Sequence, residues 1–332
     1  MPTVPDTLRH VRVTALAGGV GAARFLRGLA RAVDPSSVVI VGNTGDDAVF
    51  HGLHVSPDLD IVTYTLAGVV DEEAGWGVAA DTTHALEQMR TLGIDAWFHL
   101  GDRDLGTQLA RTTWMADGLR LSTVTDRIRR ALGVQARIIP MSDEPVRTTI
   151  LTAEGIVREF QEYFVRHRHA EDVAAVRFEG AAAARPAPGV LEAIATADVI
   201  VVCPSNPVVS IGPILAVPHI RDALRERRDA VVGISPIVEG AALKGPAARL
   251  IPLFGAEVSA SGVASLYRDF CGTFVVDRRD EPEAAKVEAL GMRAAVVETV
   301  METTGIAQAL AAEALALVTG SGAGAGGNRV AT

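Results

Sequence analysis

Residues 11–24 have the sequence V-R-V-T-A-L-A-G-G-V-G-A-A-R. The seven mostly apolar residues at its start predict a buried strand, and the glycines that follow predict a tight turn into a helix over residues 22–33. Free backbone amides and the positive end of the helix dipole make such a turn suitable for an anion. We therefore expect Gly18, Gly19 and Gly21 to form a phosphate or nucleotide loop.

This glycine turn matches a dinucleotide-binding fingerprint only in part. Gly19 and Gly21 fit the pattern G-x-G-x-x-G, but Arg24 occupies the position of the third glycine. The next predicted strand ends at Gly42 and Asn43 instead of at an acidic residue that would bind a ribose. An NAD-dependent oxidoreductase is therefore disfavoured, and Arg24 is either a phosphate ligand or a surface residue of the helix.

A second strand and its loop cover residues 38–60, where an apolar run precedes G-N-T-G-D-D-A-V-F-H-G-L-H-V-S-P-D-L-D. This connection contains four carboxylates, those of Asp46, Asp47, Asp58 and Asp60. Neighbouring carboxylates repel one another unless a cation or water screens them, and Mg²⁺ binds one or two carboxylates together with waters and phosphates. We expect a Mg-phosphate site here. The alternatives are a solvated acidic loop and, for Asp58 or Asp60, an N-cap of the following helix.

A third motif follows the most continuous β-branched run, residues 199–203, and reads P-S-N-P-V-V-S-I-G-P. Its prolines and glycine predict an open loop in which Ser205, Asn206 and Ser210 offer neutral hydrogen-bonding groups near the next helix start. N-capping by Ser205 or Ser210 is the alternative, and it is compatible with ligand binding.

Strands alternate with helices along both halves of the chain, which predicts an α/β fold with a Rossmann-like, mostly parallel sheet covered by helices on both faces. A single domain is expected over residues 11–318, with a helix-rich insertion at about residues 60–135. Within the insertion, the apolar residues 96–100 are a candidate strand. Residues 1–10 are expected to be an N-terminal tail, and the Gly/Ala-rich residues 319–332 a flexible one.

Composition excludes several classes of function. A net charge of −9 and 48% hydrophobic residues describe a globular protein that is poorly suited to binding nucleic acid through its phosphates. The sequence has no apolar run of membrane-spanning length and no signal-peptide core, so we expect a cytoplasmic protein without membrane contact. Cys203 and Cys271 are too few for a disulfide framework or a zinc site.

Lysine is rare in this sequence, and its positions exclude a further class. The only lysines are Lys244 and Lys286, and neither ends a G-x-x-x-x-G-K-[ST] pattern, so a P-loop kinase or ATPase is excluded. Phosphate groups must then be held by backbone amides, arginines or a metal ion.

Seven motifs in a fixed order give a more specific indication: A-G-G-V-G-A-A-R-F, G-N-T-G-D-D, H-G-L-x-x-S-P-D-L-D, W-G-V near Asp81, G-D-R-D-L, M-S-D-E and P-S-N-P-V-V-S-I-G-P. Across residues 11–316 this order resembles the 2-phospho-L-lactate transferase family of coenzyme F-420 biosynthesis, whose actinobacterial members use an enolpyruvyl donor. The resemblance implies a Rossmann-like transferase of a substituted phosphate group that depends on Mg²⁺. Members of that family are typically homodimers, so the resemblance also implies a homodimer.

The resemblance further implies the reaction. A phosphoenolpyruvyl or 2-phospholactyl group would pass from a guanosine diphosphate-linked donor to the deazaflavin Fo. GMP would leave, and the product would be dehydro-F-420-0 or F-420-0. The competing hypothesis is a regulatory protein of the same superfamily that binds a nucleotide sugar without turnover. The motifs G-D-R-D-L and P-S-N-P favour the transferase, because a sensor has little need for a second substrate pocket.

The resemblance assigns roles to the motif residues. Asp46 and Asp60 are predicted to hold Mg²⁺ against the diphosphate and so to be catalytic, with Asp47 and Asp58 as second candidates for metal ligation or for orienting the attacking hydroxyl. The predicted contacts with the donor and the deazaflavin are Gly18, Gly19, Gly21, Asn43, Asp47, Trp76, Asp81, Ser205, Asn206 and Ser210. Which three-carbon phosphate donor is used stays open at this point.

Overall fold

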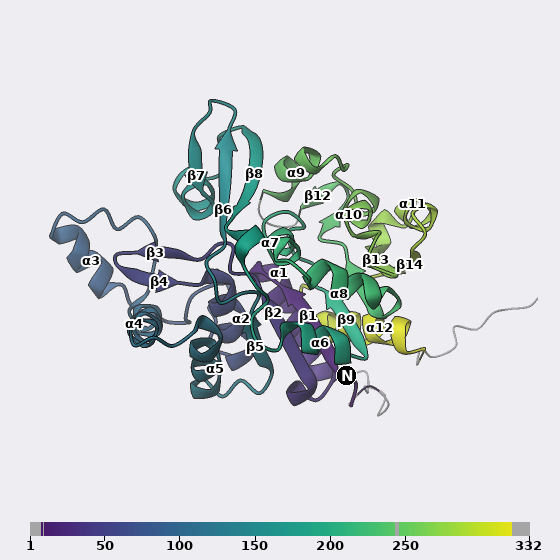
Figure 1. The fold of residues 1–332 in the computed structure, drawn as a ribbon, viewed down its shortest axis with the longest axis horizontal. Coiled ribbons are helices and arrows are strands. Elements are labelled where there is room, and N and C mark those ends of the chain that lie inside the picture. The colour runs from purple at the N-terminus through teal and green to yellow at the C-terminus, as the bar shows by residue number, and fades with distance from the viewer. Residues whose placement is uncertain (1–7, 9, 243–245, 321–332) are drawn as a thin grey trace, which may run out of the picture.

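The computed structural model describes residues 8, 10–242 and 246–320, and its centre is a seven-stranded parallel sheet (Figure 1). From one edge to the other, the strands are β14 Arg293–Val297, β13 Thr273–Asp277, β10 Val231–Ile234, β9 Val199–Val202, β1 Val13–Ala17, β2 Val38–Gly42 and β5 Arg137–Pro140. The predicted α/β fold with a parallel, Rossmann-like sheet is confirmed.

The order of the strands reverses between β1 and β9. Strands β2 and β5 extend the sheet on one side of β1, whereas β9, β10, β13 and β14 extend it on the other. Because all seven strands are parallel, their carboxyl ends lie along one edge, and open α/β sheets bind ligands in the crevice at such a reversal. The glycine turn after β1 and the P-S-N-P loop after β9 meet at this crevice.

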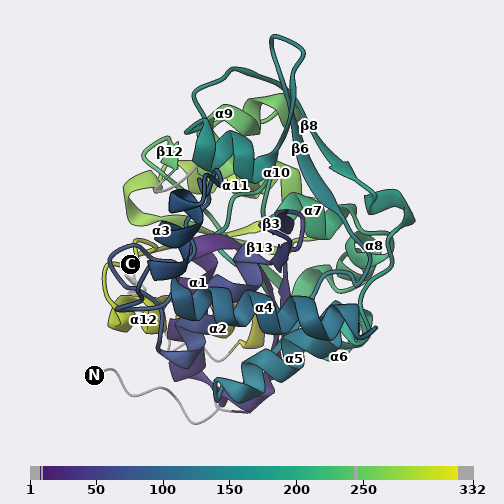
Figure 2. The ribbon, with the colours of Figure 1, turned by 90° about the vertical axis from the view of Figure 1, so that its left-hand side faces the viewer.

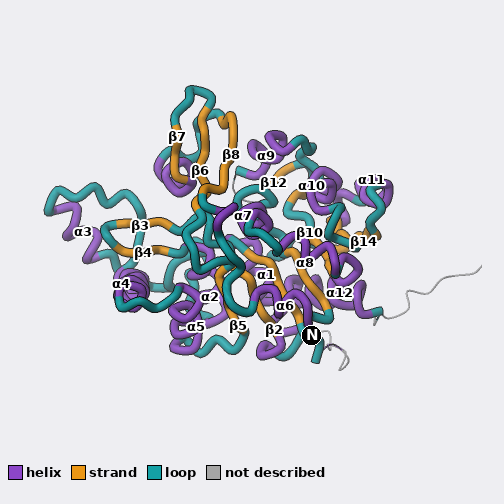
Figure 3. Tube along the Cα trace, viewed as in Figure 1, coloured by secondary structure: helices purple, strands orange, loops and turns teal. Residues whose placement is uncertain are grey.

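Helices cover both faces of the sheet, as the tube trace also shows (Figure 3). Side chains of β1 alternate between the faces, so that Ala15 packs with one buried cluster and Leu16 with the other. The first face carries α1 Gly19–Ala32 and α12 Thr304–Thr319. The opposite face carries α6 Val190–Thr196, α7 Ile211–Ala216, α8 Ile220–Glu226, α10 Ala260–Tyr267 and α11 Glu283–Ala289.

Four helices lie in the chain between β2 and β5: α2 Pro57–Ala67, α3 His84–Thr91, α4 Asp102–Ala116 and α5 Leu121–Ala131. Helix α2 begins at Pro57, so Asp58 and Asp60 lie in its first turn and do not cap it. Residues 96–100, a candidate strand, form an irregular segment instead. Its Phe98 stacks on Phe50 with ring centroids 3.9 Å apart, so packing of aromatic rings replaces strand pairing there.

Smaller sheets project from the body. The hairpin of β3 Ala48–Phe50 and β4 Leu53–Val55 belongs to the acidic connection. Strands β6 Arg147–Thr152, β7 Val157–Glu159 and β8 Val173–Glu179 form an antiparallel sheet that rises beside α9 Ala247–Leu250 (Figures 1 and 2). Strand β7 is followed by a π-helix, Glu162–Arg166. A two-stranded ribbon pairs β11 Ile237–Val238 with β12 Ala241–Ala242.

Apart from residues 8, 10, 319 and 320, both predicted tails lie outside the described residues. No helix in the described part of the chain has the length and apolar character needed to span a membrane. Cys203 and Cys271 are free and buried.

Helices α1 and α12 approach each other most closely at Gly28. A Cβ atom on Gly28 would lie 2.6 Å from the backbone nitrogen of Gln308 and closer still to the carbonyl group of Ala307. Backbone atoms cannot move aside as a flexible side chain does, so we expect Gly28→Ala to lower the free energy of unfolding by about 1–3 kcal/mol or more. Urea denaturation measures this loss.

The matched control is Gly106→Ala in α4, because a Cβ atom there would meet nothing within 4 Å. We expect this variant to gain about 0.5–1 kcal/mol from helix propensity. Equal losses in the two variants would contradict the close approach at Gly28.

Candidate active site

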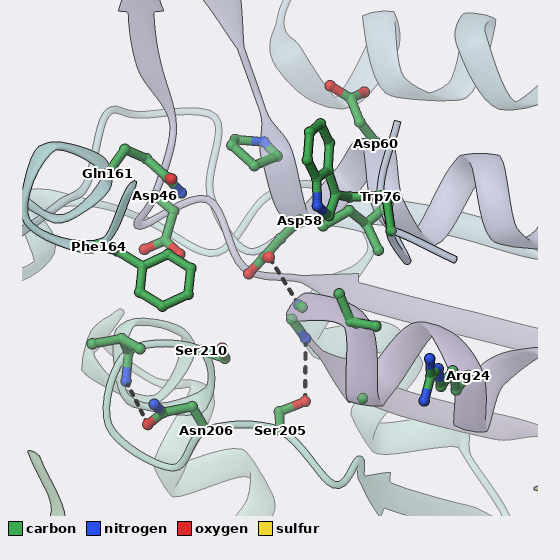
Figure 4. Close-up of a pocket in the computed structure, with 18 of the residues that line it drawn as sticks. Arg24, Asp46, Asp58, Asp60, Trp76, Gln161, Phe164, Ser205, Asn206 and Ser210 are labelled. Atoms are coloured by element: carbon green, nitrogen blue, oxygen red, sulfur yellow. Dashed lines mark hydrogen bonds between the residues drawn. The ribbon is translucent and has the colours of Figure 1, made fainter. Parts of the chain in front are cut away.

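A cleft of about 740 Å³ opens at the carboxyl ends of the sheet strands, beside the reversal between β1 and β9. Nine of the twelve site residues predicted from the sequence line this cleft: Gly18, Gly19, Gly21, Asp46, Asp60, Trp76, Ser205, Asn206 and Ser210. Asn43, Asp47 and Asp81 do not line it. Figure 4 shows most of the lining residues that carry the argument below.

Helix α1 begins at Gly19, three residues before the predicted start, so the glycines form its first turn. The amide of Gly18 donates to Ser205 Oγ at 3.4 Å, and the amide of Gly19 donates to Asp58 Oδ1 at 2.8 Å (Figure 4). The sequence predicted that these amides would bind a phosphate. In the structure, the amides of Gly18 and Gly19 are hydrogen-bonded to other side chains of the protein instead. The carboxylate of Asp58 takes the position at the helix N-terminus that an anion favours.

The glycines of this turn allow close contact between elements. A Cβ atom on Gly18 would lie 2.5 Å from Asp58 Oδ2, and one on Gly21 would lie 2.5 Å from the carbonyl oxygen of Pro204. Gly19 has a φ of +74°, a left-handed conformation that glycine adopts without strain. The turn thus contacts the acidic loop and the P-S-N-P loop directly.

Asn43, predicted to contact the donor, lies behind the wall of the cleft. Its Nδ2 donates to Asp58 Oδ2 at 2.9 Å and to the carbonyl oxygen of Val209 at 3.2 Å, and its Oδ1 accepts from the amide of Gly45 at 2.8 Å. These bonds satisfy the buried amide side chain and fix Asp58 against the end of β2. Asn43 is therefore a positioning residue for Asp58.

Asp46 is buried in the wall of the cleft, and its Oδ1 has no hydrogen-bond partner among the described residues. Burial, and then the charges of Asp58 and Asp47, raise its pKa well above the usual value. Burial also raises the pKa of Asp58 to about 6. Two adjacent carboxylates that are both penalised when ionised make a site that a cation would stabilise.

Asp47 points away from the cleft. Its Oδ2 accepts from Ser56 Oγ at 2.7 Å and lies 3.1 Å from Nε2 of His54. Burial raises the pKa of Asp47, and the contacts with His54 and Ser56 oppose that increase. These contacts hold the acidic connection to the start of α2, and Asp47 does not line the cleft.

Asp60 belongs to a buried network that joins α2 to α4. Its carboxylate forms an ion pair with Arg111 and accepts from Gln108 Nε2 at 2.9 Å. Asp104 accepts from the hydroxyl of Tyr64 at 2.8 Å and from Gln108 at 2.7 Å. Arg111 is only 1% exposed, so both charges of the pair are removed from water.

The residues present fit a hard divalent cation. No three His, Cys, Asp or Glu side chains form a ready-made ligand group in the described ranges, but Mg²⁺ needs only one or two carboxylates besides water and phosphate. The unpartnered oxygen of Asp46 meets that requirement. Asp58 is the carboxylate whose charge acts on Asp46, whereas Asp60 is paired with Arg111.

A family model described as 2-phospho-L-lactate transferase CofD matches residues 13–312. The chain belongs to the CofD family. It is 46% identical to a phosphoenolpyruvate transferase of Kitasatospora aureofaciens, over 92% of this chain and 98% of that protein. It is 40% identical to a 2-phospho-L-lactate transferase of Methanosarcina mazei, over 86% and 94% of the two chains. This CofD-family protein is therefore a transferase.

The fold of this CofD-family transferase is also similar to a crystal structure of a UPF0052-family protein from Bacillus halodurans. The TM-score is 0.62 at 19% identity, over 93% of this chain and 99% of that chain. At this identity the likeness supports the Rossmann-like fold and nothing about activity.

The G-D-R-D-L motif of this CofD-family chain caps helices. Asp81 accepts from the amide of Arg103 at 3.0 Å at the start of α4, and Asp102 accepts from the amide of Ala85 at 3.0 Å at the start of α3. Asp81 thus satisfies free backbone amides at the start of α4, and Asp102 does the same at the start of α3. Asp81, predicted as a contact around the deazaflavin, has a structural role here.

In the P-S-N-P loop, the hydroxyl of Ser210 makes no capping hydrogen bond, although Ser210 occupies the N-cap position of α7. Asn206 Oδ1 accepts from the amide of Val208 at 2.9 Å and so shapes the loop. Ser205 holds Gly18, as described above. The predicted N-cap role is therefore not found for Ser210, and its side chain lines the cleft.

Several lining residues were missed from the sequence. An aromatic wall comes from the loops before α3 and α4 and from the segment after β7. The rings of Trp76 and His99 meet in a T-shaped arrangement with centroids 5.4 Å apart. The other missed lining residues include Phe98, Phe160, Gln161, Phe164, Ser235, Pro236, Thr299, Val300, Met301 and Glu302. Those after β10 and β14 follow strand ends, which was a usable signal. The aromatic residues gave none, because their loops have no regular pattern.

Proposed function

We propose that this transferase moves a phosphoenolpyruvyl or 2-phospholactyl group from a guanosine diphosphate-linked donor to the deazaflavin Fo. The terminal ribityl hydroxyl of Fo attacks the phosphorus that carries the three-carbon group. The bond from this phosphorus to the bridging oxygen breaks, GMP leaves with that oxygen and the electron pair, and the hydroxyl proton passes to solvent water. The product is dehydro-F-420-0 or F-420-0, as expected for a step of coenzyme F-420 biosynthesis. The observation that carries the proposal is the buried Asp46, with its unpartnered oxygen, beside Asp58 at the strand-order reversal of a CofD-family fold.

In this proposal Asp46 and Asp58 hold Mg²⁺, and Asp60 is the alternative second ligand that the sequence suggested. Bound there, the ion would neutralise the diphosphate and lower the pKa of the attacking hydroxyl. The chain itself aligns the reactants, which is the larger part of phosphoryl-type transfer. Asn43 and the amide of Gly19 orient Asp58.

The aromatic wall is suited to the planar ring of the acceptor. Trp76 and Phe164 line the cleft from different segments, and Gln161 lines it as well (Figure 4). Flat aromatic side chains favour stacked or edge contacts with a flat ligand. We therefore place Fo along this wall and the guanylated donor along the first turns of α1.

The test is direct. Protein, Mg²⁺, Fo and freshly prepared guanylated phosphoenolpyruvate are mixed, and mass spectrometry follows GMP and the new deazaflavin phosphodiester. We expect both products to appear together and to be lost with EDTA. The enolpyruvyl donor is tested first because the K. aureofaciens relative, which is 46% identical to this chain, is named a phosphoenolpyruvate transferase. Tight binding of a UDP-sugar without any turnover would replace this proposal with a regulatory role.

Homodimerisation, a cytoplasmic location and the absence of nucleic-acid and membrane partners are part of the same proposal. Light scattering during size-exclusion chromatography measures the dimer, and a monomeric mass at micromolar concentration would contradict it.

A further inference from the structure

Between residues 21 and 29, helix α1 is buried on most of its surface, and one narrow stripe is half-buried. Its stripe residues Gly21, Arg24 and Arg27 recur every three positions and are half-buried. The residues between them are buried: Ala22, Ala23, Phe25 and Leu26. Because the two arginines are only half-buried, their stems can pack along the helix while their guanidinium groups stay accessible to water or to an anion. The stripe therefore presents positive charge to its surroundings.

The two arginines of the stripe differ in their partners. Arg27 forms an ion pair with Glu72 at 2.7 Å and lines a side pocket of about 120 Å³. Arg24 lines both this side pocket and the main cleft. Within the described part of the chain, no acidic side chain pairs with Arg24, which leaves its guanidinium donors available.

Arg24 is a basic residue in a cleft whose described lining is mostly acidic among its charged residues. The described residues of the lining contribute one arginine, Arg24, and no lysine. They contribute five carboxylates, those of Asp46, Asp58, Asp60, Asp104 and Glu302. Asp60 is paired with Arg111, and the other four carboxylates would repel a donor that carries a diphosphate and a carboxylate. Arg24 is the fixed positive charge among these residues that opposes that repulsion.

We propose that Arg24 binds an anionic group of the guanylated donor, a phosphate or the carboxylate, through its guanidinium. The fork of an arginine matches either group with two parallel hydrogen bonds. Arg24 lies five residues into α1, about 7.5 Å along the helix from its first residue. Asp46 and Arg24 lie on opposite sides of Asp58 (Figure 4), so the arginine would hold a part of the donor distant from Asp46. The inference rests on the proposed function and adds a specificity-determining residue to it.

The test compares Arg24→Gln, Arg24→Lys and the control Arg31→Gln, an exposed arginine on the same helix. Isothermal titration measures the Kd for GDP and for guanylated phosphoenolpyruvate with each protein. We expect Arg24→Gln to weaken donor binding by about 10- to 100-fold, the size of a lost charge-assisted hydrogen bond. Arg24→Lys should recover part of the affinity, and Arg31→Gln should bind as the unaltered protein does.

The two ligands separate the two anionic groups. Weaker binding of both GDP and the guanylated donor assigns Arg24 to a phosphate, whereas weaker binding of the donor alone assigns it to the carboxylate. If Arg24→Gln binds the donor as tightly as the unaltered protein does, this inference is overturned and the proposed function stands. Unaltered protein that binds neither ligand overturns both. Circular dichroism melting confirms that the variants compared are folded.

Discussion

Asp46→Asn should lower kcat by about 100- to 1000-fold, because the variant removes a charge from the site where we propose that Mg²⁺ binds the donor diphosphate. The fold should be retained. Asparagine has nearly the same size as aspartate. It replaces a buried carboxyl group whose pKa is raised by burial and by Asp58, so it removes a charge that the fold disfavours. Without metal the variant should therefore melt at the same temperature as the unaltered protein or higher. Steady-state release of GMP and thermal melting are the two measurements.

Titration with Mg²⁺ separates the possible ligand pairs. A ligand that binds only the folded state stabilises it by RT ln(1 + [ligand]/Kd), so Mg²⁺ should raise the melting temperature of the unaltered protein and not that of Asp46→Asn. If Asp58 is the second ligand, Asp58→Asn loses the shift and Asp60→Asn keeps it. The reverse result would restore the pair that the sequence suggested. Asp117→Asn, at an exposed aspartate after α4, is the matched control. Near-normal turnover by Asp46→Asn would remove the metal proposal.

Arg111→Met should lower the free energy of unfolding by about 3–5 kcal/mol, because it leaves Asp60 buried without its partner. The side chain of Arg111 is 2% exposed and that of Asp60 is 7% exposed, so water cannot replace the lost guanidinium. Urea denaturation at pH 7 measures the change. The double variant Arg111→Met with Asp60→Leu should regain much of the loss, since an apolar pair of similar volume does not have to desolvate charges.

The matched control is Arg12→Met, which breaks the pair between Arg12 and Asp198. Those side chains are 60% and 41% exposed, so we expect a loss of no more than about 1 kcal/mol. A similar loss in Arg111→Met and Arg12→Met would show that the link between α2 and α4 does not depend on the buried pair.

The fold and the location of the site follow from local patterns in the sequence. Apolar runs that end at glycine, proline or acidic residues predicted the central strands β1, β2 and β9, and parallel strands bring such ends to one edge of a sheet. Gly18, Asp46 and Ser205 could therefore be placed in one site although they come from three distant segments. The order of the motifs indicated the family for the same reason, since each motif follows a strand or begins a helix.

The roles of individual side chains were decided by the tertiary structure. Arg111 is 51 residues from Asp60 and on another helix, so no local pattern could show that the carboxylate chosen as a metal ligand already has a cation. Asn43 and Asp81 occupy motif positions, but the directions of their side chains make one a support for Asp58 and the other a helix cap. Sequence spacing determines which backbone elements form and where their ends meet. The pairing of buried charges depends on which side chains the packed elements turn toward each other, and the cost of leaving such a charge unpaired makes that choice specific.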